Sequence, residues 1–301
     1  MKKVEFPNIN NPHIEEIRYK KFFEVKNNPL FIKFFKDHDI EDQEILNNLS
    51  IFLRVISDQK ECLNCKGICH KVPSKAQFNV HFDEERRTFD LRLNTCSFYE
   101  RSEYLKHKFY HYDFPSSWLE YDFNNELLNN DYTKIRSNVL KNLLNALKNN
   151  NTKGLYLYGE NNIGKSFILA LFTIKFMELD KGTGAFYSSI DLFNDLGDLF
   201  FHDKEGFAIE MKALSDLDLL IIDGFGNEYI SDFVRDSYLI PLLTERKNKG
   251  KRTYFTSNFT LDELLTMYCL NKANSPKVRQ LEYLIKSLIE VMELKGAPYL
   301  L

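Results

Sequence analysis

Apolar residues follow two different spacings along this chain, and the change between them divides the sequence. Between about residues 12 and 57 they recur every three or four positions, first over residues 30–35 and again over residues 45–56. That spacing predicts amphipathic helices with one apolar face. We therefore expect the first part of the chain to be mainly helical.

From residue 154 onward, short continuous apolar runs alternate with helical patterns. This alternation predicts an α/β fold with a parallel sheet. Near-continuous apolar runs such as residues 219–222 suit strands that are covered on both faces. The expected strands span residues 155–158, 184–188, 217–222 and 253–256, and the expected helices span 165–180, 191–200, 207–215, 231–249 and 276–291.

The stretch between these two regions has a different pattern. Residues 77–82 and 88–93 alternate polar and apolar side chains around a charged turn, which predicts a β-hairpin. Residues 106–132 are polar and aromatic with little periodicity, so we expect a linker there, followed by a helix over 133–148. The expected organisation is an N-terminal domain (1–105), a linker (106–132) and a C-terminal domain (133–301).

Composition narrows the classes of partner. The 301 residues carry a formal net charge of −3 at pH 7, so any contact with nucleic acid must come from a local basic patch. The N-terminal residues lack the apolar segment of a secretory signal, and no stretch reaches the roughly 18 apolar residues of a membrane span. We expect a cytoplasmic protein with no membrane partner.

A phosphate-binding motif follows the first expected strand of the C-terminal domain. Residues 159–166 read G-x-x-x-x-G-K-S, which is the P-loop pattern in the strand–loop–helix context that the motif needs. Backbone N–H groups of the loop and the N-terminus of the next helix would bind phosphates. Lys165 would contact the β- and γ-phosphates, and the Ser166 hydroxyl would bind Mg²⁺. The motif therefore predicts a nucleoside triphosphate site.

Two further polar residues follow expected strands of the same sheet. Asp223 ends the apolar run 219–222 and would complete the Mg²⁺ site. Asn258 follows the strand at 253–256, where it would hydrogen-bond the γ-phosphate or hold the attacking water. Thr260 with Glu263 is the better helix cap in this region, which leaves Asn258 available for that role.

A group of cysteines predicts a metal site in the N-terminal domain. Four of the five cysteines fall within one short region: Cys62, Cys65, Cys69 and Cys96. In a reducing cytoplasm such a group favours a metal over disulfides. Cys62-x-x-Cys65 supplies half of a tetrahedral Zn²⁺ site, and Cys96 returns after the hairpin. His81, Cys69 and His70 are the alternatives for the fourth ligand, and the zinc would be structural because the segment is too small for a large core.

Three blocks of the C-terminal half carry a family resemblance. They are residues 154–159 leading into the P-loop, residues 233–236 and residues 253–258. In order and spacing they resemble the AAA+ ATPases, and within them the replicative helicase loaders of the DnaI/DnaC type. The resemblance covers roughly the whole chain and is weaker in the N-terminal helices. It implies an AAA+ P-loop NTPase parallel sheet preceded by a small, mainly helical zinc-binding domain with a β-hairpin.

The resemblance also implies roles for particular residues. Asp223 would be the Walker B aspartate, Asn258 sensor 1, and Glu228 the acidic residue that closes the Walker B segment. Zinc ligands in the family order would be Cys62, Cys65, His81 and Cys96. The implied nucleotide contacts are Gly159, Glu160, Asn161, Asn162, Ile163, Gly164, Lys165, Ser166, Phe167 and Arg279.

Two departures from the family pattern concern hydrolysis. The residue after Asp223 is Gly224, where the family carries a second acid that activates water, and glycine can neither accept a proton nor orient water. Near the C-terminus only Arg279 is available for the arginine contacts that the family makes with nucleotide. We therefore predict ATP binding with weak ATP hydrolysis.

The resemblance implies a loader that binds the replicative DNA helicase and places it on single-stranded DNA, with ATP-dependent self-association. The basic run at 246–252 would contact DNA, or would simply be a solvated turn. The alternatives are a transposition-helper AAA+ ATPase and a nucleotide-binding adaptor with little hydrolysis. A small-molecule kinase would need an acceptor pocket, for which the sequence gives no sign.

Overall fold

A computed structural model of the chain describes residues 12–63, 76–121, 134–149, 151–269 and 275–296. The chain divides into two compact units, Met1–Glu100 and Arg101–Leu301. Helix α5 (Ser97–Lys106) spans the boundary between them. Each unit is described by itself below.

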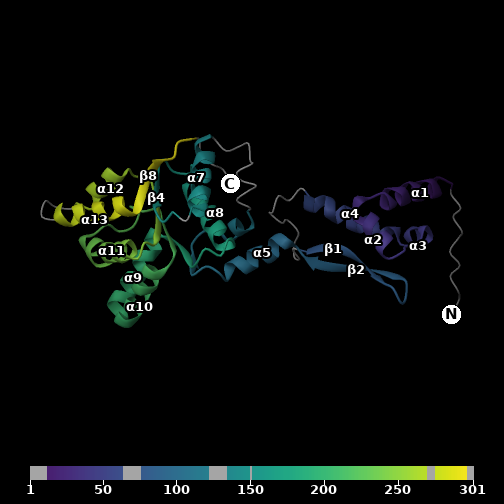
Figure 1. The fold of residues 1–301 in the computed structure, drawn as a ribbon, viewed down its shortest axis with the longest axis horizontal. Coiled ribbons are helices and arrows are strands. Elements are labelled where there is room, and N and C mark those ends of the chain that lie inside the picture. Colours follow the sequence, from purple (N-terminus) through teal and green to yellow (C-terminus); the bar gives the residue numbers. More distant parts are fainter. Residues whose placement is uncertain (1–11, 64–75, 122–133, 150, 270–274, 297–301) are drawn as a thin grey trace, which may run out of the picture. The chain divides into compact units, whose positions relative to one another are not determined.

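The first unit packs four helices against a two-stranded hairpin (Figure 1). Its elements are α1 (Pro12–Lys26), α2 (Pro29–Asp37), α3 (Asp42–Asn47), α4 (Leu49–Leu63), β1 (Ala76–Asp83) and β2 (Thr88–Thr95). The ring of Phe52 makes edge-on contacts with three other phenylalanines, Phe31, Phe35 and Phe89. Since Phe82 and Phe89 are paired across the hairpin, the aromatic residues join both strands to the helices. The expected helices and hairpin are confirmed.

The second unit is built on a six-stranded sheet in which every pair of neighbouring strands is parallel. The strand order is β3-β5-β6-β7-β4-β8. The bounds are β3 (His111–Tyr112), β4 (Gly154–Tyr158), β5 (Gly184–Ser188), β6 (Leu219–Asp223), β7 (Arg252–Ser257) and β8 (Ile289–Glu293). The predicted parallel α/β sheet is confirmed, with β7 between the strand before the P-loop and the strand that ends at Asp223.

Alternate residues of the central strands are buried in two different cores. Tyr156 and Phe255 belong to the core under α9 (Ser189–His202), α10 (Lys204–Asp216), α11 (Ile240–Asn248), α12 (Leu261–Met267) and α13 (Ser275–Leu288). Leu157 and Tyr254 belong to the core under α7 (Lys134–Lys148) and α8 (Lys165–Glu178). The sheet is therefore covered on both faces (Figure 1), which explains the uninterrupted apolar runs of its strands.

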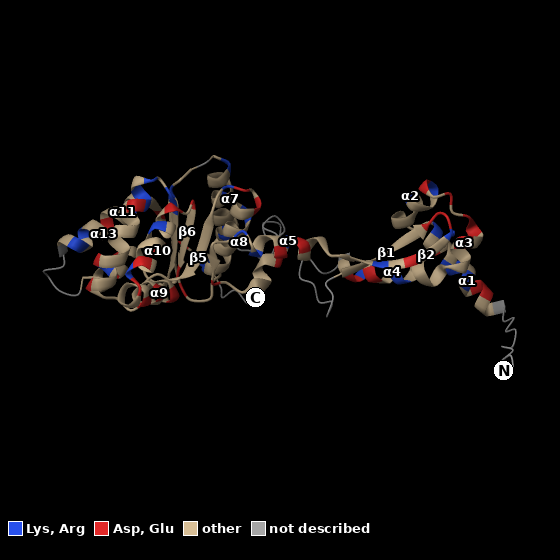
Figure 2. Ribbon diagram, turned by 90° about the horizontal axis from the view of Figure 1, so that it is seen from below, with Lys and Arg blue, Asp and Glu red and all other residues tan. Residues whose placement is uncertain are grey.

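Charged residues are distributed unevenly between the helices and the buried strands. Figure 2 shows Lys, Arg, Asp and Glu mainly on the helices, while β5 and β6 are drawn mostly in tan. Both signs of charge occur on the helices of each unit, although α7 carries only basic and α9 only acidic residues among Lys, Arg, Asp and Glu. This pattern agrees with the small net charge of the sequence.

The structure differs from the expectation of a linker at residues 106–132. Residues 122–132 lie outside the described residues, but 107–121 belong to the second unit. His111 and Tyr112 pair with β5 at the edge of the sheet, and the short helix η1 (Ser116–Glu120) contributes the buried Leu119. Pairing with the sheet, which the local pattern did not reveal, gives this polar and aromatic stretch its structure.

Two other element boundaries differ from expectation. The helix expected over 231–249 begins with a wider π-helical turn, η2 (Val234–Leu239), and continues as α11. The helix expected over 276–291 ends at Leu288, and the chain goes straight into β8 beside β4. The apolar residues at the end of α13 continue into β8, so spacing alone did not separate helix from strand.

Candidate nucleotide site

The P-loop is held by contacts at both of its ends. Gly159 has φ of +150°, and a Cβ atom there would lie 2.3 Å from the carbonyl oxygen of Leu294. At the other end, the Nε of buried Arg136 on α7 donates to the carbonyl of Ile163 at 3.1 Å. The loop therefore has a fixed shape, with glycine required where the chain approaches β8. Sequence reasoning missed Arg136, because only the fold brings α7 to the loop.

Lys165 lies at the start of α8 and connects the loop to the neighbouring strand. Its Nζ donates to the carbonyls of Gly159 (2.9 Å) and Glu160 (2.6 Å), and to Oδ1 of Asn258 (3.0 Å). Burial lowers the pKa of Lys165, while the nearby Asp223 carboxylate acts in the opposite direction. These contacts bring together the predicted P-loop lysine and the predicted sensor residue.

Asp223 lies at the carboxyl end of β6, beside the residues of β7. The Thr256 hydroxyl donates to Oδ1 of Asp223 at 2.6 Å and accepts from the backbone N–H of Gly224 at 2.8 Å. Burial raises the pKa of Asp223, and hydrogen bonds from Thr256 and Ser166 partly offset that effect. A divalent cation favours the ionised carboxylate, so Ser166 and Asp223 together suit Mg²⁺.

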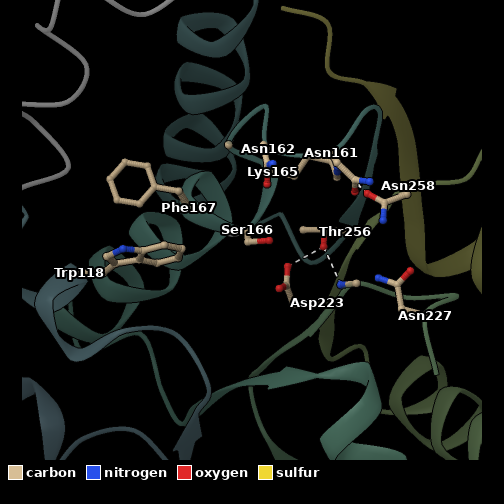
Figure 3. Close-up of a pocket in the computed structure, with 12 residues that line it drawn as sticks. Trp118, Asn161, Asn162, Lys165, Ser166, Phe167, Asp223, Asn227, Thr256 and Asn258 are labelled. Carbon is tan, nitrogen blue, oxygen red and sulfur yellow. Dashed lines mark hydrogen bonds between the residues drawn. The ribbon is translucent and has the colours of Figure 1, made fainter. Parts of the chain in front are cut away.

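These residues surround a cavity of about 320 Å³. Figure 3 shows Ser166 between the Trp118–Phe167 side and the Asp223–Thr256 pair, with Asn258 just after the end of β7. The lining residues are Trp118, Asn161, Asn162, Gly164, Lys165, Ser166, Phe167, Asp223, Gly224, Asn227, Thr256 and Asn258. The cavity offers backbone N–H groups, an ammonium, a carboxylate and amides, which is a set that suits a polyphosphate with a divalent cation.

Five residues predicted for the nucleotide site do not line this cavity: Gly159, Glu160 and Ile163 of the P-loop, and Glu228 and Arg279. Glu228 is buried, and its carboxylate accepts from the N–H of Gly226 at 2.7 Å and from the hydroxyl of Tyr268 at 2.5 Å. Its role in the structure is to fix the turn after β6. Arg279 is exposed on α13 and is absent from the cavity lining.

Three lining residues were assigned no role by sequence reasoning, although Thr256 lies within the block 253–258. Trp118 comes from η1 and contacts the ring of Phe167 edge-on, with 5.1 Å between ring centroids. Thr256 and Asn227 lie beside Asp223. The sole Trp of the sequence could have been flagged for its rarity, but nothing local connects it with residue 167.

The predicted DNA-contacting basic run is mostly engaged within the protein. Arg246 is fully buried and donates to carbonyls of Leu214 (2.5 Å), Leu217 (2.9 Å) and Arg252 (2.5 Å), as well as to the hydroxyl of Thr253 (2.8 Å). Lys249 and Lys251 form ion pairs with aspartates on the α10 side of the sheet, Asp216 and Asp218. The alternative prediction of a solvated turn is wrong for Arg246, which is buried, whereas Lys249 and Lys251 are partly exposed in their ion pairs.

The predicted zinc site is only partly within the described residues. Cys65, Cys69 and His70 lie outside them, whereas Cys62, His81 and Cys96 lie inside. The described residues contain no group of three or more His, Cys, Asp or Glu side chains placed to hold a metal. The structure thus confirms a helical domain with a hairpin but does not show it to be zinc-binding. One observation fits a ligand role, because Nδ1 of His81 is buried without a hydrogen-bond partner in the described part of the chain.

Comparisons with known proteins support the fold and the family resemblance. No family model matches the chain. The chain is 31% identical over 115 residues to the replicative helicase loader DnaI of Bacillus subtilis (strain 168), a match that covers 37% of this chain and 35% of that protein. The match thus spans about a third of the curated relative's length. A solved structure of DnaI superimposes with a TM-score of 0.53 at 19% identity, covering 64% of this chain and 98% of that one.

The DnaI/DnaC-type resemblance is confirmed. A solved DnaC helicase loader is also similar, with a TM-score of 0.47, 20% identity, and coverage of 58% of this chain and 96% of that one. The second unit has the fold of the DnaI structure, and its P-loop, Asp223 and Asn258 lie together at one end of the parallel sheet. No helix within the described ranges is long and apolar enough to cross a membrane.

Proposed function

We propose that this chain is an ATP-dependent loader that binds the replicative DNA helicase and helps to place it on single-stranded DNA. The observation that carries the proposal is the cavity in which P-loop, Asp223 and Asn258 meet, in a fold similar to that of DnaI. The similarity to a protein named replicative helicase loader supplies the class of partner.

In this proposal the triphosphate binds at the N-terminus of α8. Lys165 moves its ammonium from the loop carbonyls to the β- and γ-phosphates, and Asn258 remains beside it. Ser166 and Asp223 would hold Mg²⁺, which supplies positive charge to the phosphate oxygens. Trp118 and Phe167 form an aromatic wall of the same cavity and would contact the apolar face of the nucleotide.

Nucleotide binding can be measured directly, because the single Trp of the chain lines the cavity. We expect ATP with Mg²⁺ to change the fluorescence of Trp118, with a saturable response. Lys165→Ala removes the positive charge at the phosphates and should lower the affinity for ATP by at least about 10-fold. Lys175→Ala, on the same helix but away from the cavity, is the matched control.

Hydrolysis should be slow. Gly224 supplies no side chain, and the described part of the cavity lining contains no arginine, although an arginine contributes about 10³-fold or more where one is used. We expect turnover below about 1 s⁻¹ in the absence of a partner. Several turnovers per second for the purified chain would refute this part of the proposal.

The loader role is tested by mixing the full chain with the replicative helicase of the same organism, with and without ATP. We expect a stable complex on size-exclusion chromatography, and helicase transfer onto labelled single-stranded DNA that Lys165→Ala reduces. Sedimentation with ATP tests the expected self-association. Failure to form a complex under both conditions would exclude the loader, even if ATP binds.

A nucleotide-binding adaptor remains the second candidate, and Gly224 favours it. In that case ATP binding, without turnover, would be sufficient for helicase transfer. Transfer with a non-hydrolysable ATP analogue at the rate seen with ATP would identify the adaptor.

We also propose that Cys62, Cys65, His81 and Cys96 bind Zn²⁺ in the first unit. The buried Nδ1 of His81, which has no hydrogen-bond partner among the described residues, supports this. Metal analysis of the full chain should give about one zinc per chain, which Cys96→Ser lowers. Cys269→Ser, in the other unit, should leave the zinc content unchanged. A folded, zinc-free wild-type chain would contradict the assignment.

A further inference from the structure

The chain reverses direction immediately after Asp223. The N–H of Asn227 donates to the carbonyl of Gly224 at 2.9 Å, which closes a four-residue turn. Gly224 has φ of +71°, a left-handed conformation that other residues adopt at a cost. A Cβ atom built on Gly224 would lie 2.9 Å from Nδ2 of Asn227. The Asn227 amide therefore occupies the space in which a side chain of residue 224 would begin.

This turn is rigid, so the Asn227 side chain starts from a fixed point. Phe225 is fully buried, its N–H donates to the carbonyl of Thr256 at 2.8 Å, and its carbonyl accepts from the Ser257 hydroxyl at 2.6 Å. The next N–H, that of Gly226, is held by the buried carboxylate of Glu228. These contacts attach the turn to β7 on one side and to Tyr268 on the other.

The Asn227 amide lies at the cavity and is free to bind there. Asn227 lines the cavity together with Asp223, Lys165 and Asn258, and no hydrogen bond of its side chain is found within the described ranges. By contrast, the Oδ1 of Asn258 is engaged by Lys165. Asn161 and Asn162 belong to the P-loop, whereas Asn227 lies on the same side of the cavity as Asp223 (Figure 3), and its amide lies next to Gly224.

We propose that the Asn227 amide orients the attacking water for ATP hydrolysis, in the position left without a side chain by Gly224. This inference rests on the proposed ATP site. An amide carries an acceptor and two donors, so Oδ1 accepts from the water while Nδ2 donates to an oxygen of the terminal phosphate. Amide side chains orient the attacking water in GTPases, which establishes that the group is chemically adequate.

The chemistry explains why hydrolysis would be slow but not absent. The water oxygen bonds to the γ-phosphorus as the bond to the bridging oxygen breaks, and that oxygen leaves with its electron pair on ADP. The proton of the water passes to a phosphate oxygen, because an amide cannot accept it. Asn227 therefore contributes orientation without general-base catalysis, which is consistent with weak turnover.

The test compares Asn227→Ala and Asn227→Asp in the full chain. Asn194, exposed on α9 away from the cavity, supplies matched controls as Asn194→Ala and Asn194→Asp. Single-turnover rates with excess protein measure hydrolysis, and Trp118 fluorescence measures ATP affinity. We expect Asn227→Ala to slow hydrolysis about 10-fold or more while ATP affinity changes by less than about 3-fold.

The aspartate variant separates a water-orienting role from a structural one. Its carboxylate keeps an oxygen acceptor and can also accept a proton, so Asn227→Asp should hydrolyse ATP at least as fast as wild type. Its rate should rise with pH as the carboxylate ionises. Equal rates for wild type and Asn227→Ala, or equal rates for the alanine and aspartate variants, would overturn the role of Asn227. Absence of any fluorescence response to ATP in wild type would instead refute the proposed function.

Discussion

Replacing Thr256 by valine would test how the cavity holds its carboxylate. Thr256 is 1% exposed, and its hydroxyl links the N–H of Gly224 (2.8 Å) to the carboxylate of Asp223 (2.6 Å). Valine has nearly the same shape but no hydroxyl. Thr256→Val therefore removes both hydrogen bonds and leaves a donor and a carboxylate oxygen without their partner.

The expected loss of stability follows from the two hydrogen bonds that Thr256→Val removes. A neutral hydrogen bond contributes about 1 kcal/mol and one to a charged group about 1.5–3 kcal/mol, so Thr256→Val should lower the free energy of unfolding by about 3 kcal/mol. Thr256→Ser keeps the hydroxyl and loses one buried methyl group, at a cost of about 1 kcal/mol. The expected difference between the two variants is about 2 kcal/mol.

Urea unfolding followed by Trp118 fluorescence measures this difference, because Trp118 reports on the unit that contains the site. The serine variant should retain the enhancement of ATP binding by Mg²⁺, whereas the valine variant should lose part of it. If Thr256→Val and Thr256→Ser unfold with the same midpoint and slope, the Thr256 hydroxyl does not stabilise the site through these two hydrogen bonds.

Three further predictions concern buried charged groups. Burial raises the pKa of Asp223 above its ordinary value of 3.8, so the stability associated with this group is full below about pH 4 and is lost as pH rises through the folded pKa. Asp223→Asn should thus stabilise the nucleotide-free chain at neutral pH but not at pH 4, while abolishing the effect of Mg²⁺ on ATP binding. If Asp223→Asn were less stable than wild type at pH 7, the expected direction of the stability change would be wrong. Arg246→Met leaves buried carbonyls without donors and should lower the unfolding free energy by about 3 kcal/mol or more. The salt dependence of any DNA binding should stay unchanged, and a shallower slope would instead restore Arg246 as a DNA contact. Glu228→Gln should destabilise the chain by about 1–3 kcal/mol with ATP affinity unchanged, and a selective loss of turnover would return Glu228 to a catalytic role.

The parts of the fold that sequence predicted are those with a strong local pattern. The P-loop could be recognised because its glycines, Lys165 and Ser166 all fall within residues 159–166, and Asp223 could be recognised because it ends a buried apolar run. The central strands were found because burial on both faces removes polar residues from them. Phosphate binding by a loop and burial of a strand both constrain residues that are close together in the sequence, so both leave a local pattern.

The missed parts depend on residues that are distant in the chain. Two-residue β3 exists because it pairs with β5, and β8 was hidden because the helical pattern of α13 continues into it. Trp118, Thr256 and Asn227 acquire a role only when η1, β7 and the turn after β6 meet at one cavity. Arg246 looked like a solvated basic residue, but its surroundings are carbonyl oxygens from other elements.

The pairing of β8 with β4 also bears on when during synthesis the nucleotide loop can form. β8 pairs with β4 along its full length, and the N–H of Leu294 donates to the carbonyl of Tyr158 at 2.7 Å, directly before the loop. A ribosome releases β4 long before β8, because chains are made from the N-terminus. Until residue 294 has emerged, one edge of β4 has no partner, and the loop lacks the carbonyl that approaches Gly159. We expect a nascent chain from which residue 294 has not yet emerged to bind nucleotide more weakly than the folded protein.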